Sequence, residues 1–319
     1  MNTPLSISVI VPTLGKSSVL HALLKSLSEQ KTEAPFEVLL IDNSQDPEVA
    51  KNLKSVCSVF SLNLKQIVIE SKGVNEARNV GIKESQSNLL LFIDDDSWLN
   101  DRYLLQKHIQ LHLKNENYFA IGGNYVLEKD AGFLDQCYQD IQMRWLYQGV
   151  VNLESNQSKY LIGGHFSAKK ELLTRFSLQF DPVIKYGGSE LSLFNQAFKQ
   201  NLFMRLENLS LVHVPHVSLK GLIKKLYKQG QGKAYLNDDD GSSSQHSALV
   251  EGVSLAKRSF LYFLNLVFWF GFYQQKNKGL LIIRHIFKDF FGNIQLKRFQ
   301  TLKKIEDQLE QKKNRGDRL

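Results

Sequence analysis

Three consecutive aspartates, Asp94, Asp95 and Asp96, are the residues of this 319-residue chain whose type and spacing best suit chemistry. They follow the apolar run Leu89–Ile93, which is typical of a strand buried on both faces. Adjacent carboxylates repel one another unless a cation or hydrogen-bond donors compensate their charge. Oxygen ligands of this kind suit Mg²⁺ or Mn²⁺, ions that commonly bind phosphates. A helix-capping role is the alternative that this stretch alone leaves open.

Apolar strands alternate with helical segments before the aspartates. Strand patterns lie at 7–11, 38–41, 64–69 and 89–93, and helical spacing lies at 19–27, 49–59 and 76–84. Ser17 or Ser18 is the expected cap of the first helix. This order predicts right-handed βαβ crossovers and a mostly parallel sheet. We therefore expect the polar clusters at 12–15, 42–46 and 94–96 to gather along the carboxyl edge, where such sheets bind ligands.

Four short motifs occur in an order that carries a family resemblance. They are Pro12-Thr13, Asp42-Asn43-Ser44 with Asp46, the helix start Gly73–Gly81, and Asp94-Asp95-Asp96. In this order the chain resembles the family-2 inverting glycosyltransferases of the glycosyltransferase A-type fold, over roughly residues 5–216. The resemblance implies an α/β fold, with a mostly parallel Rossmann-like sheet and helices on both faces.

The resemblance also implies a nucleotide-sugar donor site at the aspartates. Asp96 would ligate Mn²⁺ or Mg²⁺, which stabilises the charge of the leaving diphosphate as a Lewis acid. Asp94 would lie nearer the donor ribose, and Asp95 belongs to the donor-binding set without an assigned contact. His213 lies near the end of the apolar run 209–214 and is the second expected metal ligand. An imidazole ligand suits Mn²⁺ better than Mg²⁺. A structural role for His213 is the alternative.

Further donor contacts are implied on two other motifs. Asp42 would accept hydrogen bonds from the base or ribose, and Arg78 would bind phosphate or base edges with its planar fork. Taken singly, Asp42 also fits an Asx turn and Arg78 a solvated helix face. The donor-binding set is completed by Pro12, Thr13 and Asn43. The expected nucleotide is UDP, GDP or TDP.

The acceptor site is expected in the second half of the resemblance. Residues 160–169 resemble the segment that lines the sugar pocket, where Gly163 and Gly164 would allow close backbone approach to the ligand. Relatives usually carry an acidic pair where this chain has Ser189-Glu190. Glu190 is therefore the expected general base of an inverting transfer, and a simple helix-start acid is its alternative. Asp181 is the next carboxylate to test.

Other histidines and the cysteines receive structural interpretations. His108 and His112 share a helix face but lack the glutamate of a zinc-protease motif, so we expect surface or groove residues. His165, beside Gly164, has no assigned role. The two cysteines indicate neither a disulfide framework nor a zinc site.

Charge divides the chain unevenly. It contains 40 Lys and Arg and 32 Asp and Glu, a net charge of +8, and residues 253–319 alone contain 14 basic and 5 acidic residues. We predict a nucleotide-sugar-binding half at 1–125 and an acceptor-binding, catalytic half at 126–236. A polar linker at 237–250 would then lead to a basic, aromatic-rich helical extension at 251–319.

The extension predicts contact with a membrane surface. Its run Phe260–Tyr273 would reach about 21 Å as a helix, short of a hydrocarbon core of about 30 Å. Apolar aromatic helices beside basic residues, here also at 280–291, favour the surface of an anionic membrane, and 297–313 resembles a basic solvated helix. Packing on the catalytic domain or in a homodimer stays open. No zinc finger, recognition helix or stacking platform supports nucleic-acid binding. The lack of a charged-then-apolar leader predicts a cytoplasmic protein, peripheral on the inner face of the membrane.

The resemblance and the charged extension predict a metal-dependent, inverting glycosyltransferase that uses a nucleotide-sugar donor. Its expected acceptor is a glycan, either lipid-linked or a precursor of envelope polysaccharide. Two other classes stay open. A nucleotidyltransferase would need a better glycine- and basic-rich loop than residues 12–16 supply. A catalytically inactive membrane scaffold is favoured by the incomplete acidic motif at Ser189-Glu190.

Overall fold

The computed structural model describes residues 5–16, 18–70, 73–184, 189–235 and 254–275. The predicted linker at 237–250 and the helical runs expected at 280–291 and 297–313 lie outside the described residues. The strands are β1 (Ile7–Thr13), β2 (Phe36–Asp42), β3 (Leu64–Val68), β4 (Leu89–Ile93), β5 (Ser97–Trp98), β6 (Tyr118–Leu127), β7 (Val150–Asn152), β8 (Gln157–Ser158), β9 (His165–Lys169) and β10 (Phe203–His213). The helices are α1 (Leu20–Ser28), α2 (Pro47–Cys57), α3 (Val74–Glu84), α4 (Leu104–Lys114), α5 (Phe133–Gln148), α6 (Lys170–Arg175), α7 (Ser189–Lys199), α8 (Leu219–Tyr235) and α9 (Leu255–Gln275).

One mixed and mostly parallel sheet forms the centre of the molecule, as predicted. Its strand order is β3-β2-β1-β4-β9-β6-β10-β8-β7, with β5 beside β10. The first four strands in this order are parallel, and β6 is parallel to β10. Strand β9 runs antiparallel between β4 and β6 and so joins the two parallel groups. The sheet contains strands from both predicted halves, and their division at residue 125 stays a prediction.

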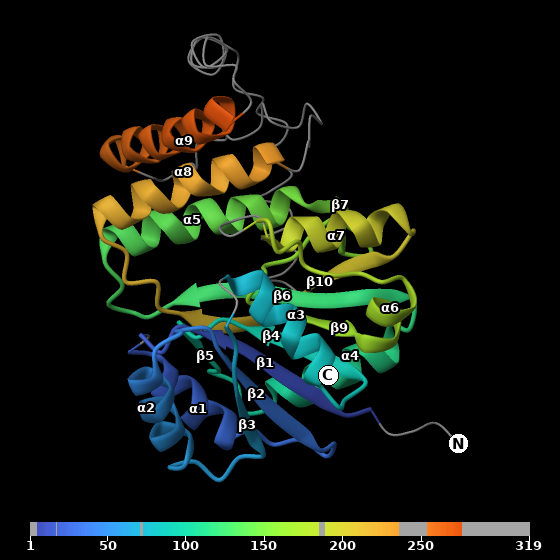
Figure 1. The fold of residues 1–319 in the computed structure, drawn as a ribbon. Coiled ribbons are helices and arrows are strands. Elements are labelled where there is room, and N and C mark those ends of the chain that lie inside the picture. The colour runs from blue at the N-terminus through green and yellow to red at the C-terminus, as the bar shows by residue number, and fades with distance from the viewer. Residues whose placement is uncertain (1–4, 17, 71–72, 185–188, 236–253, 276–319) are drawn as a thin grey trace.

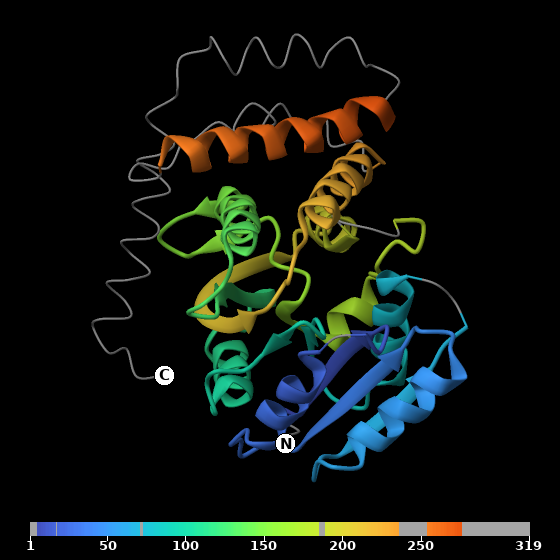
Figure 2. The same ribbon diagram turned by 90° about the vertical axis from the view of Figure 1, so that its left-hand side faces the viewer.

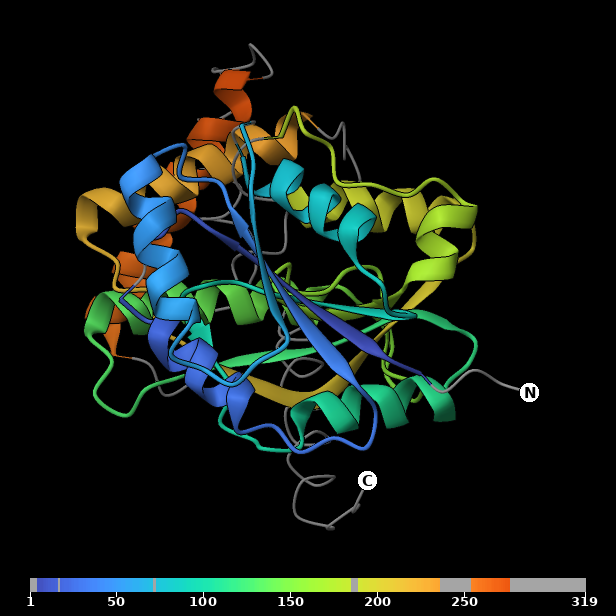
Figure 3. The same ribbon diagram turned by 60° about the horizontal axis from the view of Figure 1, so that its bottom comes forward.

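Helices cover both faces of the sheet, because the apolar strands present side chains to both (Figure 3). On β4, Leu89, Leu91 and Ile93 pack in a core shared with α1, α2 and α4. Leu90 and Phe92 pack in the opposite core with α3, α6 and α7. The uninterrupted apolar run before the aspartates is therefore explained by burial on both faces.

The prediction that Ser18 caps the first helix is wrong. Helix α1 begins at Leu20 with Val19 in the capping position, and Ser17 lies outside the described residues. Four buried leucines hold the helix against the sheet: Leu20, Leu23, Leu24 and Leu27. Packing of this apolar stripe stabilises the helix without a polar cap.

Two C-terminal helices, α8 and α9, stack over α5 at the end of the molecule away from α1 and α2 (Figures 1 and 2). A buried cluster joins the three helices through residues such as Tyr138, Leu226 and Trp269. Packing on the catalytic domain, one of the two interpretations of the extension, is thus confirmed for α9. None of the helices in the described ranges has the length and apolar character that a membrane crossing requires.

The α8–α9 crossing brings the two backbones into direct contact at two glycines. A Cβ on Gly230 would lie 1.9 Å from the carbonyl oxygen of Phe268, and one on Gly271 would lie 2.1 Å from that of Tyr227. Any side chain larger than hydrogen therefore has to push the helices apart.

We expect Gly230→Ala to lower the free energy of unfolding by about 1–3 kcal/mol, because the added methyl overpacks the crossing. Chemical unfolding followed by circular dichroism measures the loss. Gly221→Ala, at an exposed position of α8 whose nearest foreign atom would be Ser218 Oγ at 3.0 Å, is the matched control. Equal stability of the two variants would contradict the account of this crossing.

Candidate active site

Polar residues at the ends of β1, β2 and β4 meet at the carboxyl edge of the sheet, as predicted. Thr13 lies opposite Asp42 in the β1–β2 register, and the Thr13 carbonyl accepts a hydrogen bond from Asn43 N at 2.8 Å. Thr13 Oγ1 donates to Asp95 Oδ2 at 2.6 Å. Three segments far apart in the sequence are therefore tied together at one edge.

The Asp42 carboxylate is fully buried and is used within the protein. Its Oδ1 accepts from Ser44 N at 2.9 Å, and its Oδ2 accepts from Gln66 Nε2 at 3.2 Å. This is the Asx-turn arrangement that the sequence left open. Pro12, opposite Ile41 in the register, and the buried Asn43 lie beside this turn. Donor contacts from these residues stay a prediction.

Arg78 is buried and paired with the first aspartate of the triplet. Its Nη2 donates to Asp94 Oδ1 at 2.7 Å, and its guanidinium lies 5.3 Å from the centre of the Phe180 ring. Only 3% of Arg78 is exposed, so the solvated-helix-face alternative is wrong. The pair fixes Asp94 at the sheet edge while compensating one charge of the triplet.

Helix α3, which carries Arg78, also holds the loop before α7. Asn75 Nδ2 donates to the carbonyl oxygens of Asp181 and Ile184 at 2.6 and 2.9 Å. Asn79 makes a two-way contact with the Phe180 backbone, donating to its carbonyl oxygen at 2.8 Å and accepting from its N–H at 3.0 Å. The helix thus positions a cationic side chain and a loop together.

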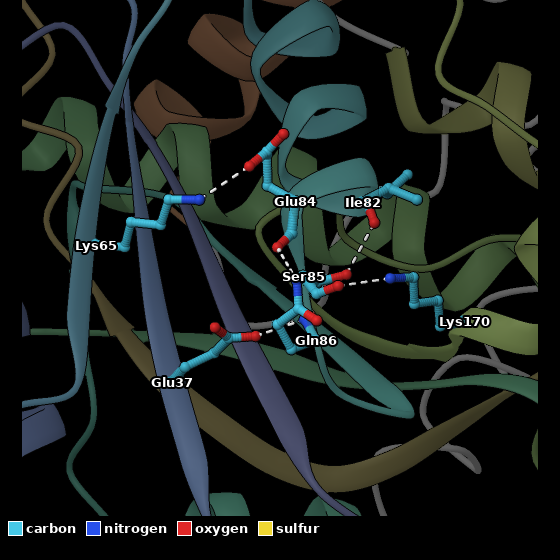
Figure 4. Close-up of polar contacts among 7 residues, drawn as sticks. All are labelled: Glu37, Lys65, Ile82, Glu84, Ser85, Gln86 and Lys170. Atoms are coloured by element: carbon cyan, nitrogen blue, oxygen red, sulfur yellow. Dashed lines mark hydrogen bonds and ion pairs between the residues drawn. The ribbon is translucent and has the colours of Figure 1, made fainter.

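The opposite end of α3 is anchored at the other edge of the sheet (Figure 4). Glu84 Oε2 pairs with Lys65 Nζ of β3 at 2.9 Å, and the Ser85 carbonyl oxygen accepts from Lys170 Nζ at 2.5 Å. Gln86 N donates to Glu37 Oε1 of β2 at 2.7 Å. With both ends held, α3 presents Asn75, Arg78 and Asn79 to the site from a fixed position.

For the nucleotide-sugar transfer that the family resemblance implies, we expect Asn79→Ala to lower kcat by about tenfold while nucleotide affinity changes little, because the loop before α7 loses its backbone anchor and positioning suffers. Stability should fall by about 1–3 kcal/mol, since the Phe180 backbone groups lose their partner. Asn88→Ala is the matched control, because Asn88 Oδ1 accepts two hydrogen bonds from Ser6 away from the site. It should lower stability without changing kcat; parallel losses of kcat in both variants would contradict a positioning role.

Asp96 and His213 face one another where β5, which begins just after Asp96, pairs with the end of β10. His213 Nε2 lies 3.5 Å from Asp96 Oδ2, and the His213 ring stacks on Tyr125 at 4.3 Å. Burial acts to raise the pKa of Asp96, but hydrogen bonding and attraction from His213, followed by the charge of Lys225, bring it below the usual range. Asp96 therefore remains an ionised carboxylate.

Asp95 has a different environment from its neighbours. Burial raises its pKa to about 7 against the hydrogen bond from Thr13, and the charges of Asp96 and Asp94 add to the rise. Its contact with Thr13 ties β4 to β1, which is a structural contact at the edge of the site.

The donor set at Asp96 suits a hard divalent cation. Asp96 Oδ1 and His213 Nδ1 are buried and form no hydrogen bond within the described part of the protein. In that same part, no cluster of three or more His, Cys, Asp or Glu side chains is arranged as a complete metal cage. Mg²⁺ and Mn²⁺ sites on phosphate substrates commonly use one or two carboxylates and complete their shell with phosphate oxygens and water. Asp96 with His213 fits that type of site.

A glycine pair lets the backbone approach the carboxylates closely. A Cβ on Gly164 would lie 2.3 Å from both Asp94 Oδ2 and Tyr125 Oη. A Cβ on Gly163 would lie 3.1 Å from Glu190 Oε2 and 3.3 Å from Arg78 Nη1. Glu190, in the first turn of α7, therefore reaches the site and faces Arg78 across Gly163.

Asp181, the alternative carboxylate, is used in its own turn. Its Oδ1 accepts from Val183 N at 2.9 Å, and its carbonyl oxygen accepts from Asn75. Asp181 is thus held within its own turn, whereas Glu190 borders Gly163 at the site.

The expectation that His108 and His112 are surface or groove residues is wrong. Both are buried on α4 and contact Ser167 Oγ of β9, at 2.8 Å from His108 Nδ1 and 2.9 Å from His112 Nε2. His165 is also buried, with its Nδ1 2.9 Å from the Asn124 carbonyl oxygen. Ser167, distant in sequence, contacts one ring nitrogen of each histidine on α4, and helix spacing alone does not reveal such a partner.

Comparison with known proteins identifies the family of the chain. The model of glycosyl transferase family 2 matches residues 8–176, more than half of the chain. The chain belongs to this family. The uncharacterized glycosyltransferase YfnE of Bacillus subtilis is 31% identical over 115 residues, which are 36% of this chain and 29% of that protein.

Two other relatives have more specific names. The poly(ribitol-phosphate) beta-N-acetylglucosaminyltransferase TarS of Staphylococcus aureus is 32% identical over 100 residues, or 30% of this chain and 17% of TarS. The GalNAc(5)-diNAcBac-PP-undecaprenol beta-1,3-glucosyltransferase of Campylobacter jejuni is 27% identical over 200 residues, or 61% and 56%. The matches to YfnE and TarS thus span less than a third of those proteins.

The fold is also similar to that of a solved mannosyltransferase. The mannosyltransferase PcManGT of Pyrobaculum calidifontis, in complex with GDP-Man and Mn²⁺, superposes with a TM-score of 0.56 at 15% identity, covering 92% of this chain and 89% of that one. The glycosyltransferase A-type fold predicted from the motif order is therefore confirmed.

Proposed function

We propose that this family-2 protein is a metal-dependent, inverting hexosyltransferase that moves a sugar from a nucleotide-sugar to an acceptor hydroxyl. The observation that carries the proposal is that the Asp94–Arg78 pair and Glu190 border Gly163 and Gly164 at the carboxyl edge of the sheet. The Asp96–His213 pair is joined to them through Tyr125, whose hydroxyl borders Gly164 and whose ring stacks on His213.

The aspartate edge is the proposed donor site, for UDP, GDP or TDP bearing the sugar. Asp96 and His213 would hold Mn²⁺ or Mg²⁺, which when bound supplies Lewis-acid stabilisation of the diphosphate charge. The complex of PcManGT with GDP-Man and Mn²⁺ supports this chemistry for a protein of the same fold. Arg78 orients Asp94 toward the donor while staying buried beneath it.

Glu190 is the proposed general base. Its carboxylate takes the proton of the acceptor hydroxyl as that oxygen attacks the anomeric carbon. The bond from that carbon to the diphosphate oxygen breaks, the diphosphate leaves with the electron pair, and the configuration inverts. A scaffold without activity remains the competing class, and the presence of an acid at this place argues against it.

The proposed acceptor is a lipid-linked or envelope polysaccharide precursor at the inner face of the membrane. The Campylobacter relative, whose name includes an undecaprenol-linked acceptor, supports a lipid-linked substrate. Helix α9 exposes 44% of Phe263 and 52% of Phe270, apolar surface suited to the headgroup boundary. Peripheral attachment through residues 253–319 on the cytoplasmic side follows from this proposal.

Binding to phospholipid vesicles tests the proposed membrane attachment in full-length variants that keep α8 and α9. Phe263→Ser with Phe270→Ser should reduce co-sedimentation with anionic phospholipid vesicles by at least fivefold. The control is Val59→Ser with Val68→Ser, which removes two apolar side chains that are exposed away from α9. Equal binding by wild type and both double variants would overturn this attachment.

A transfer assay tests the activity itself. Purified protein is incubated with UDP-, GDP- and TDP-sugars, Mn²⁺, and either lipid-linked or soluble oligosaccharide acceptors, and products are resolved by mass spectrometry. Transfer from one donor, faster to the lipid-linked acceptor and with inverted anomeric configuration, is the expected result. Absence of turnover with every donor would favour the inactive scaffold, and a retained configuration would overturn the inverting mechanism.

A further inference from the structure

Helix α8, which lies beyond the family-matched residues 8–176, brings a lysine to the predicted metal site. The Lys225 ammonium lies 4.3 Å from the centre of the Tyr138 ring and hydrogen-bonds the Tyr138 side chain. Tyr138 is buried, with its ring 6.2 Å from that of His213, which contacts Asp96. A continuous set of contacts thus leads from α8 to the aspartate edge.

Lys225 differs from Arg78 in its exposure to solvent. The Lys225 residue is exposed, whereas Arg78, which pairs with Asp94, is buried. Lys225 can therefore reach a ligand from the solvent side.

We propose that Lys225 binds the diphosphate of the donor, as an ammonium that α8 holds over Tyr138 next to the Asp96–His213 pair. This rests on the proposed function. A diphosphate entering an edge lined by three aspartates meets like charge, and a compact, strongly charged ammonium offsets it and donates hydrogen bonds to phosphate oxygens. Because α8 is fixed to α9 at Gly230 and Gly271, the C-terminal helices would form one wall of the donor site.

Calorimetric titration separates diphosphate binding from base binding. The ligands are uridine, guanosine, thymidine and their diphosphates, each titrated in the presence of Mn²⁺. The proteins are wild type, Lys225→Gln, Lys225→Arg and the control Lys224→Gln. Lys224 is an exposed neighbour of Lys225 on the same helix. Lys225→Gln should weaken diphosphate binding about tenfold or more, the range of a hydrogen bond to a charged group, without changing nucleoside binding. Lys225→Arg should recover most of the loss, and Lys224→Gln should match wild type.

A measurement on the wild type keeps the proposal testable if the variants fold poorly. Reductive methylation with formaldehyde and borohydride, followed by peptide mass spectrometry, should show Lys225 protected by the bound diphosphate while Lys224 reacts as before. Diphosphate binding without protection of Lys225, or an equal loss of nucleoside and diphosphate affinity in Lys225→Gln, would overturn the role of Lys225. Failure of the wild type to bind any nucleotide would instead overturn the proposed function, and the Lys225 proposal with it.

Discussion

Replacing Glu190 by Gln should lower kcat by about 10²–10⁴-fold, the range for loss of a general base, while nucleotide affinity stays within about twofold. Glutamine keeps the size of the side chain but cannot take the acceptor proton. Glu190 reaches the site from the first turn of α7, and its carboxylate lies beside Gly163. The turns after β1 and β2, which are expected to hold the nucleobase, are a different part of the site. Transfer rates with saturating donor and acceptor, together with nucleotide titration, measure the two quantities.

Asp181→Asn is the matched control for Glu190→Gln. Its carboxylate accepts the Val183 N–H within its own turn, and the asparagine carbonyl can keep that hydrogen bond. We expect a rate close to that of wild type. If Glu190→Gln turned over at the wild-type rate, or if Asp181→Asn lost as much activity as Glu190→Gln, the assignment of the base would be contradicted.

Acidification should destabilise the fold steeply through its buried histidines. Burial lowers the pKa of His112 to about 3 and that of His165 to about 4, and it lowers the pKa of His108 well below the usual value. Unfolded histidines titrate near pH 6.5, so below that pH the unfolded state binds more protons than the folded state. The contribution of these histidines to stability is therefore fully present above about pH 6.5 and is lost as the pH drops toward 4, by about 1.4 kcal/mol per pH unit for each histidine.

The slope of unfolding free energy against pH, from urea unfolding between pH 7 and 4, measures this effect. His112→Gln should have a smaller slope than wild type, because glutamine can contact Ser167 Oγ without titrating. His21→Gln, on the exposed face of α1, should keep the wild-type slope. Identical slopes in wild type and His112→Gln would show that the buried cluster does not govern acid sensitivity.

The strands and their polar ends were predictable because they depend on local patterns. Leu89–Ile93 is apolar at every position since both of its faces are buried, and its end marks the edge where Thr13, Asp42 and Asp94 meet. The parallel order followed from alternating strands and helices. The catalytic candidate Glu190 required the family resemblance, because an acid in the first turn of a helix also has a purely local explanation.

Contacts made across long sequence separations were not predictable. Lys225 is one of several lysines on α8, and nothing local distinguishes it from Lys224 until Tyr138 is placed against it. The expected exposure of His108 and His112 was wrong because their shared partner, Ser167, lies more than fifty residues away in the sequence. Asn75 and Asn79 had a usable signal, since residues four apart share one helix face, but their backbone partners at 180–184 became evident only in the fold.

Calorimetric titration of UDP, GDP and TDP, with Mn²⁺ and with chelator, against wild type and Asp96→Ala tests the donor site most directly. The account predicts that one nucleotide binds, that its binding needs Mn²⁺, and that Asp96→Ala abolishes the Mn²⁺-dependent part while the variant unfolds at the wild-type temperature or above. Absence of binding by every nucleotide, or binding that is equal with chelator and in Asp96→Ala, would contradict a metal-dependent donor site at this edge of the sheet.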